Sequence, residues 1–102
     1  MTTLHQLRRC PWAAAVRQAL DNVGRDYGVV QVPYERARRA EVRELTGQEL
    51  TPVLVDGDRV VVDSHRIVAY LYGTYGDEGQ RRRADELRRL VDASPMLCAV
   101  GS

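Results

Sequence analysis

The segment that most constrains the fold covers residues 3–20, where a short apolar stretch passes through Cys10 and Pro11 into a run of helix-forming residues. Leu4 and Leu7 flank a polar pair, and we interpret this stretch as a short strand. The residues after Pro11 are rich in alanine and other strong helix formers. Proline suits the first helical position, because its missing N–H is not needed there and its φ already fits. The sequence therefore predicts a strand followed by a helix, with Cys10 at the mouth of that helix.

Cys10 stands where a cysteine is easily made reactive. The free backbone N–H groups of Trp12 and Ala13 and the positive end of the helix dipole favour its thiolate, which is the nucleophilic form. The alternative is a buried, inert cysteine, since free cysteine is often a core residue. The only other cysteine, Cys98, lies in a tail. We interpret it as incidental, with a role in resolving an oxidised Cys10 left open, and we expect no structural disulfide in a reducing compartment.

Composition excludes several classes of protein. A chain of 102 residues forms one domain with at most an appendage, and 44% hydrophobic with 28% charged residues is ordinary for a soluble globular protein. No apolar run approaches a membrane span, and the first ten residues do not resemble a secretory signal, so we expect a cytoplasmic protein. The 15 arginines are nearly balanced by 14 acidic residues. Nucleic-acid binding needs a basic excess, so we expect neither nucleic acid nor membrane as a partner.

The rest of the chain predicts a regular succession of elements. An apolar strand over 27–32 follows the first helix, which implies a βαβ unit. Asp56-Gly57 between two β-branched runs predicts an antiparallel hairpin over 51–62. Further periodic segments predict helices over 34–45, 63–75 and 79–93. The predicted fold class is α/β, a four-stranded mixed sheet in the order β-α-β-α-β-β-α flanked by helices, with an additional C-terminal helix.

The side chains on two of the predicted helices indicate what each helix faces, solvent in one case and the domain or a partner in the other. The helix over 34–45 carries interspersed charges at spacings that allow intrahelical pairs, which indicates a solvated face: Arg36, Arg38, Arg39 and Arg43 with Glu35, Glu41 and Glu44. The helix over 79–93 has only the apolar stripe Leu87, Leu90 and Val91, which could dock on the domain or on a partner, including a second copy in a homodimer. We divide the chain into a domain over 1–76 and a C-terminal helical extension over 77–102.

Four features together resemble the glutaredoxin family and the N-terminal domain of glutathione transferases, both of thioredoxin-like fold. They are the order of elements, Cys10-Pro11-Trp12-Ala13 at the first turn, Thr51-Pro52 before a hairpin, and Asp63-Ser64 at a helix start. The resemblance covers residues 3 to about 76. It implies glutathione, or another low-molecular-weight thiol, as the cofactor, and glutathionylated or oxidised proteins as substrates.

The resemblance also implies a role for each matching position. Cys10 matches the nucleophile, and Pro52 matches a cis-proline that faces it and turns the backbone of Thr51 toward the cysteinyl part of glutathione. Asp63 and Ser64 match the pair that holds the γ-glutamyl end. A carboxylate suits the free amine of the tripeptide, and the serine hydroxyl with helix N–H groups suits its α-carboxylate.

Simpler interpretations stay open for these positions. Asp63-Ser64 could be only a helix cap, Thr51-Pro52 only a strand entry, and Arg8 and Arg9 only exposed residues, although Arg8 or Arg9 could meet the glycine carboxylate of glutathione. Pro11 and Trp12 adjoin the thiol, and Trp12 either lines the groove or packs on the sheet. His5 and His65 are interpreted as surface or strand residues, because neither has a partner at metal-ligand spacing.

Two departures from the family limit the chemistry. Ala13 replaces the second cysteine of a CPxC motif, so only monothiol exchange is available to Cys10. The residues after Gly76 are too few for the helical domain with which glutathione transferases bind their electrophiles, so conjugation is not expected.

The leading hypothesis is therefore a glutaredoxin-like monothiol thiol-disulfide oxidoreductase that acts through Cys10. A non-catalytic thiol-binding or protein-interaction module with the same fold is the alternative. Iron–sulfur carriage by a dimer is a third reading, disfavoured because the sequence after Cys10 does not match the motif of such relatives and Trp12 is bulky.

Overall fold

The computed structural model describes residues 1–7, 10–48 and 51–93. One sheet contains all four described strands, in the order β2-β1-β3-β4. Its strands are β1 (Thr2–Gln6), β2 (Gly28–Gln31), β3 (Val53–Asp56) and β4 (Arg59–Val62). β1 pairs with β2 in parallel and with β3 antiparallel, and β4 pairs antiparallel with β3. The sheet is thus mixed, as predicted, with β4 at one edge.

Helices connect and cover these strands. They are α1 (Pro11–Asn22), the short 3₁₀ helix η1 (Arg36–Arg38), α2 (Ala40–Thr46), α3 (Ser64–Tyr75) and α4 (Glu78–Ala93). The order β-α-β-α-β-β-α and the strand order confirm the predicted thioredoxin-like α/β fold class. Among the described helices, none combines the length and the apolar character needed to cross a membrane.

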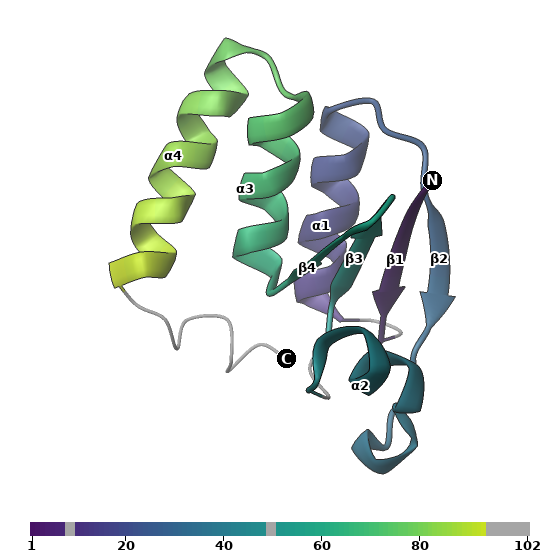
Figure 1. Ribbon diagram of the computed structural model, residues 1–102. Coiled ribbons are helices and arrows are strands. Elements are labelled where there is room, and N and C mark those ends of the chain that lie inside the picture. Colours follow the sequence, from purple (N-terminus) through teal and green to yellow (C-terminus); the bar gives the residue numbers. More distant parts are fainter. Residues whose placement is uncertain (8–9, 49–50, 94–102) are drawn as a thin grey trace.

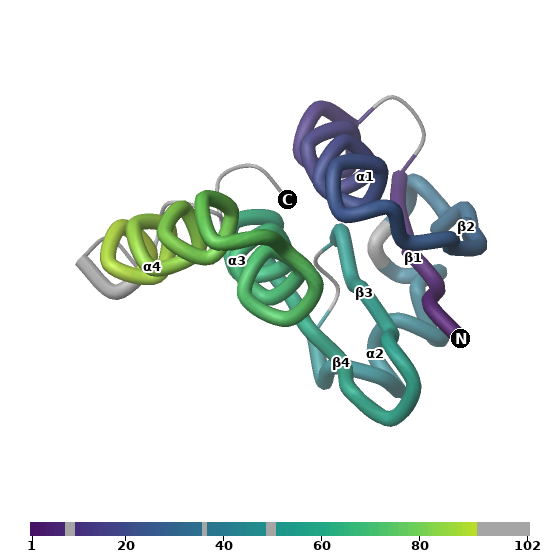
Figure 2. Tube along the Cα trace, turned by 90° about the horizontal axis from the view of Figure 1, so that it is seen from above, coloured from purple at the N-terminus to yellow at the C-terminus, as the bar shows by residue number. Residues whose placement is uncertain are grey.

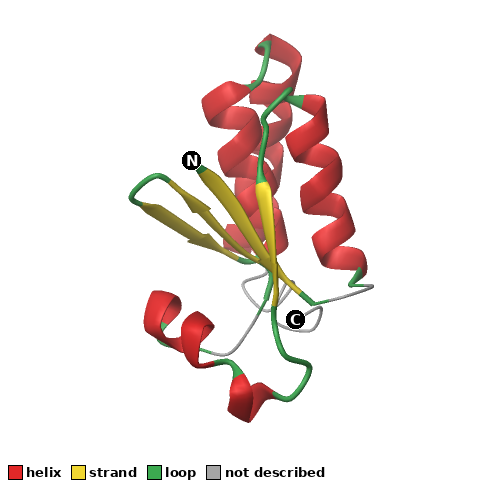
Figure 3. Ribbon diagram, turned by 90° about the vertical axis from the view of Figure 1, so that its right-hand side faces the viewer, coloured by secondary structure: helices red, strands yellow, loops and turns green. Residues whose placement is uncertain are grey.

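The main core lies between the sheet and the pair α1 and α3, which cover the same face (Figures 1 and 3). Leu4 of β1 and Leu54 of β3 are paired across the strands and fully buried against these helices. The helices contribute Val16, Ala19, Leu20, Ile67 and Leu71. Burial of each large aliphatic side chain contributes about 1.5–3 kcal/mol, so this cluster fixes α1 and α3 on the sheet.

A smaller cluster holds α2 on the opposite face, where Val42 packs against Val32 and Val53. The predicted helix over 34–45 was wrong in its first half, which contains only η1 before α2 begins at Ala40. Arg39 explains the difference, because its side chain donates to the carbonyl oxygens of Pro33 at 2.9 Å and Tyr34 at 2.8 Å.

The predicted solvated face was also wrong for Arg39, which is only 3% exposed. The carbonyl groups of Pro33 and Tyr34 lie beyond the paired residues of β2, and the buried guanidinium supplies them with donors. The side chain is thus used to turn the chain beneath the sheet.

α4 packs outside α3, on the side away from the strands (Figure 2). Ala84 and Leu87 of α4 are buried against Ala69 of α3, while Leu90 is 51% exposed. The apolar stripe of α4 is therefore split, with most of it docked on the domain. The division of the chain at residue 76 stays a prediction.

Candidate active site

Three of the predicted site segments lie next to the same end of the sheet. Val53, the first residue of β3, is paired with His5 of β1 and with the last residue of β4. Cys10 follows β1, Pro52 directly precedes β3, and Asp63 directly follows β4. The lower ends of α1 and α3 in Figure 1 begin at this edge. The topology thus gathers the starts of two helices and the entry to β3 around one end of the sheet.

Cys10 is the N-cap residue of α1. Its backbone is extended, with φ −83° and ψ 121°, and Pro11 occupies the first helical turn. Its carbonyl accepts from Ala14 N–H at 3.0 Å, which closes the first turn. The side chain is partly exposed and forms no capping hydrogen bond. Cys10 is therefore not a fully buried core residue, while its catalytic role stays a prediction.

The peptide bond between Thr51 and Pro52 is cis, as the resemblance implied. Both residues are buried, and among the described residues the hydroxyl oxygen Oγ1 of Thr51 has no hydrogen-bond partner. Their contact with a ligand stays a prediction.

Asp63 combines a cap with an unusual backbone. Its carboxylate accepts the N–H of His65 at 3.3 Å, so the residue does cap α3. It also has φ +78° and ψ 121°, and it is the one described residue other than glycine with positive φ. Such a conformation costs about 1–3 kcal/mol and persists mainly where function or packing demands it. Ser64, the first residue of α3, is only 4% exposed.

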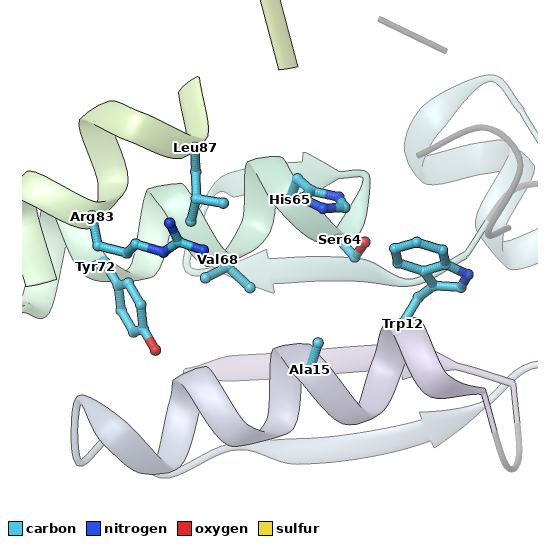
Figure 4. A pocket seen from close by; sticks show the side chains of 8 residues that line it. All are labelled: Trp12, Ala15, Ser64, His65, Val68, Tyr72, Arg83 and Leu87. Carbon is cyan, nitrogen blue, oxygen red and sulfur yellow. The ribbon is translucent and has the colours of Figure 1, made fainter. Parts of the chain in front are cut away.

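A groove of about 250 Å³ adjoins this end of the sheet and separates α1 from α3 and α4 (Figure 4). Trp12 and His65 form its end nearest Ser64, with ring centroids 5.6 Å apart and planes tilted by 50°. The remaining lining comes from Ala15, Val68, Tyr72, Arg83 and Leu87. Trp12 therefore lines this groove, while its contact with a bound thiol stays a prediction.

Two groove residues were not anticipated as such. His65 was interpreted as a surface or strand residue, yet it lies in α3 and is partly buried beside Trp12. The spacing of His65, Val68 and Tyr72 on one helical face was the available signal. Arg83 of α4 carried no such signal, because its position depends on how α4 docks. The predicted residues Arg8 and Arg9, and the tail cysteine Cys98, lie outside the described residues.

Asp56 at the other end of β3 is a buried carboxylate that the hairpin interpretation treated only as a turn residue. It accepts hydrogen bonds from Thr2 Oγ1 at 2.7 Å, from Tyr70 Oη at 2.6 Å, from Tyr75 Oη and from Arg25 Nη2 at 3.3 Å. The turn itself is Gly57-Asp58, with φ +64° at Gly57. This cluster joins the second half of α3 and the start of β1 to the end of β3, and it lies away from Cys10.

The hydrogen bonds set the protonation of this cluster. Burial alone would raise the pKa of Asp56, but the donors from Tyr70, Tyr75, Thr2 and Arg25 outweigh burial and hold that pKa well below its ordinary value. Burial and the hydrogen bond to Asp56 raise the pKa of Tyr70, and the same hydrogen bond, followed by burial, raises the pKa of Tyr75. The network therefore favours an ionised carboxylate with two neutral phenols.

The comparisons of the sequence and of the structure with known proteins point to the same family. Residues 4–79 match the sequence profile described as "Glutathione S-transferase, N-terminal domain". Among curated proteins, none matches this chain. Solved structures do, and glutathione transferase E6 from Drosophila melanogaster is 27% identical with a TM-score of 0.72 over 95% of this chain and 48% of its own. The E7 isozyme of the same organism is 26% identical with a TM-score of 0.71 over 92% and 47%.

A more distant structure agrees in fold. The theta class glutathione S-transferase from Xanthomonas axonopodis pv. citri, solved with glutathione bound, is 20% identical with a TM-score of 0.70, over 91% of this chain and 49% of its own. This chain thus spans less than half the length of each of these three proteins.

Proposed function

Because this chain belongs to the family of glutathione S-transferase N-terminal domains, we propose that it binds glutathione at the end of the sheet around Cys10 and uses that thiol in monothiol exchange. The observation that carries the proposal is the position of Cys10, partly exposed at the N-cap of α1. Two relatives at 26–27% identity are glutathione transferases, and a third structure of the same fold contains glutathione.

The binding mode follows from what each residue can offer. The Asp63 carboxylate has a second oxygen beyond the one that caps α3, and it suits the ammonium of the γ-glutamyl end. Ser64, with the first N–H groups of α3, suits the neighbouring α-carboxylate. We place the cysteinyl part of the tripeptide beside the backbone of Thr51, with its sulfur directed toward Cys10. Arg8 or Arg9 is proposed for the glycine carboxylate.

The proposed reaction has two exchange steps. The Cys10 thiolate attacks the glutathione sulfur of a glutathionylated protein, and the disulfide bond between that sulfur and the protein's cysteine sulfur breaks. The protein leaves as a thiolate while Cys10 carries the glutathionyl group. A second glutathione thiolate then attacks that sulfur, and oxidised glutathione leaves as the Cys10 thiolate is restored. With Ala13 in place of a second cysteine, the sequence motif offers no internal dithiol route. We propose that this happens in a reducing, cytoplasmic setting.

The test compares the two cysteine variants on one substrate. Cys10→Ser should abolish glutathione-dependent release of glutathione from a glutathionylated test protein, and Cys98→Ser should retain it. Turnover that survives Cys10→Ser would remove the enzyme proposal.

Binding without turnover is the alternative, and calorimetry separates it from the first proposal. A non-catalytic module would bind glutathione in the wild type and in Cys10→Ser while releasing nothing from the test protein. A panel that includes other small thiols identifies the natural one. This chain spans less than half of each of the transferases that it matches, and the proposal concerns these residues alone.

A further inference from the structure

The outer edge of β4 offers backbone groups to a further strand. Among the described strands, β4 is at the end of the sheet and pairs with β3 alone. Asp56 and Arg59 flank the two-residue turn of this hairpin, so they are a pair whose backbone groups bond to each other. By alternation, the backbone N–H and C=O groups of Val60 and Val62 are directed away from β3. No backbone hydrogen bond from another described residue outside the sheet reaches these two residues.

A cavity lies where β4, α3 and α4 meet. Its volume is about 360 Å³, and its apolar lining comes from Val61, Ala69, Val91 and the ring of Tyr70. Val61 packs against the main core, so its side chain is on the face of β4 that α3 covers. A strand added to β4 would lie about 4.8 Å away and would place one of its own side chains beside Val61. That side chain would enter the cavity.

The charged residues at this cavity are positive. Arg66 of α3 and Arg88 of α4 line it, and none of its described lining residues is acidic. Arg59 lies two residues before Val61 in β4 and therefore on the same face of the strand. Its guanidinium lies over the Tyr70 ring, 5.9 Å from the ring centroid. Three arginines from three elements thus surround one apolar cavity.

These arginines are available to a partner. Arg66 forms no ion pair with any residue that the structure describes. Arg88 pairs with Asp85 at 3.1 Å, but both side chains are more than half exposed, and exposed pairs of this kind contribute little. Carboxylates on a partner can therefore pair with both guanidinium groups at modest cost.

A second copy of this chain has the wrong charge for this surface. Two copies joined along β4 would bring Arg59, Arg66 and Arg88 of both to the same seam, and like charges that face each other destabilise paired strands. A partner that carries acidic residues has the complementary charge.

We propose that β4 and the cavity beside it form a docking surface for an extended acidic segment of another protein. The segment lies antiparallel to β4 as an additional strand and places an apolar side chain in the cavity beside Val61. Two residues before and after that side chain, on the same face, it carries carboxylates that pair with the arginines. Backbone bonds to Val60 and Val62 supply affinity, while the cavity and the arginines select the sequence.

The experiment titrates the isotope-labelled protein with a capped peptide of sequence TETLTET. In an extended chain its leucine and both glutamates share one face, and its threonines lie on the other. Saturable shifts of the backbone amides of Val60 and Val62 are expected. TKTLTKT reverses the charge, and TETLPET lacks one backbone N–H next to the leucine, so each should bind at least tenfold more weakly. Equal binding of the three peptides, or no saturable shift with TETLTET, overturns the proposal.

Matched variants locate the charged contacts. Arg66→Gln and Arg88→Gln should each weaken binding of TETLTET about threefold, as expected for an exposed ion pair. Arg82→Gln makes the same change of charge at an exposed position of α4 outside the cavity lining, and it should leave the affinity unchanged. Equal affinity of all three variants overturns the proposal.

Val60→Pro tests the backbone contact. It removes an N–H that is directed away from β3, so the pairing of β3 with β4 is kept while binding of TETLTET should be lost. Urea unfolding verifies the fold of this variant, and undiminished binding by a folded Val60→Pro protein overturns the proposal. Sedimentation without peptide tests the occupant. A monomer agrees with the proposal, whereas a dimer that Val60→Pro dissociates means that a second copy covers β4, which overturns it.

Discussion

The Tyr70 hydroxyl donates a 2.6 Å hydrogen bond to Asp56 Oδ2 and so connects α3 to the last residue of β3. Tyr75 donates to the same oxygen, and the two phenol rings meet edge to face at 6.4 Å. Arg25 lies over the Tyr75 ring at 4.5 Å and also pairs with Asp56 Oδ1 at 3.3 Å. One carboxylate thus connects the second half of α3 to the sheet and to the chain before β2. The same helix begins at Ser64, beside Asp63.

Asp56→Asn should therefore be among the more destabilising polar changes in the chain. The amide keeps the shape but offers one acceptor and an unwanted donor to groups that all donate, and loss of buried charge-assisted bonds costs about 3 kcal/mol. Urea unfolding measures the loss. Asp58→Asn, in the exposed turn two residues away, is the matched control and should change stability by less than about 0.5 kcal/mol. Equal effects of the two variants would contradict the anchoring role.

The same cluster predicts a pH dependence of stability. Because the folded protein lowers the pKa of Asp56, its stabilisation is complete above the ordinary carboxyl pKa and is lost as the pH falls through about 4 and below. Unfolding free energies measured at falling pH should therefore converge for wild type and Asp56→Asn. A difference between them that stays constant down to about pH 3 would contradict the linkage.

At alkaline pH, Tyr70 and Tyr75 predict the opposite dependence: stability falls as the pH rises. Their pKa values are raised in the folded protein, so the stabilisation is complete below about pH 10, the ordinary value, and is lost as the pH rises beyond it. Tyr70→Phe should be less stable at neutral pH and should lose less stability above about pH 10 than the wild type. Parallel curves for the two proteins would contradict this assignment.

Local sequence signals were sufficient to predict the backbone structure around Cys10, but not the hydrogen-bond network around Asp56. Cys10-Pro11 fixes a helix start by the geometry of proline alone, and Asp56-Gly57 predicts a hairpin by the backbone freedom of glycine. The partners of Asp56 come from three other segments, and no period or spacing connects them. Its role as a buried hub could therefore be read only from the structure.

The burial of Arg39 could not be predicted from the local sequence either. On a helical wheel it belongs with the other charged residues of its segment, and the pattern favours exposure. What decides its position is the supply of unpaired carbonyls at Pro33 and Tyr34 after β2 ends. Such a requirement depends on where a strand stops pairing, which a single sequence does not specify.

Trp12 is the one tryptophan of the chain, so indole fluorescence reports on the groove directly. We expect glutathione to change this emission saturably in both wild type and Cys10→Ser, because binding precedes chemistry. His65→Ala should shift the emission of the free protein and destabilise it by about 0.5–1.5 kcal/mol, through loss of the ring contact at 5.6 Å. Calorimetric binding without any change of emission would place glutathione away from Trp12.

Two glycines near the α3–α4 turn should respond oppositely to alanine. A Cβ at Gly73 meets the Arg88 guanidinium at 2.4 Å, the far end of a flexible side chain that can move away. Gly73→Ala should therefore stabilise the protein by up to about 1 kcal/mol, the difference in helix propensity. A Cβ at Gly76 meets the Tyr72 carbonyl oxygen at 2.4 Å and Gln80 at 2.6 Å, so Gly76→Ala should destabilise. Thermal midpoints of the two variants give the signs, and equal signs would contradict this account.

Three substitutions at Asp63 separate its role as a helix cap from its proposed role as a ligand for glutathione. Asp63→Gly accepts the positive φ without strain and costs little as a cap, so its stability should match or exceed that of wild type. Asp63→Ala keeps the strain and loses the cap, and it should be less stable than Asp63→Gly by about 1–2 kcal/mol. Asp63→Asn keeps a capping oxygen and tolerates positive φ, so its fold should be intact.

The binding of glutathione by these three variants should follow charge and not stability. All three lack the carboxylate that would pair with the γ-glutamyl ammonium, so each should bind about tenfold more weakly by calorimetry, whatever its unfolding midpoint. If affinity instead follows stability, with Asp63→Gly and Asp63→Asn binding like wild type, the carboxylate serves α3 alone. The unusual backbone at this position would then need an explanation within the fold, such as the placement of Ser64, because no ligand contact would account for it.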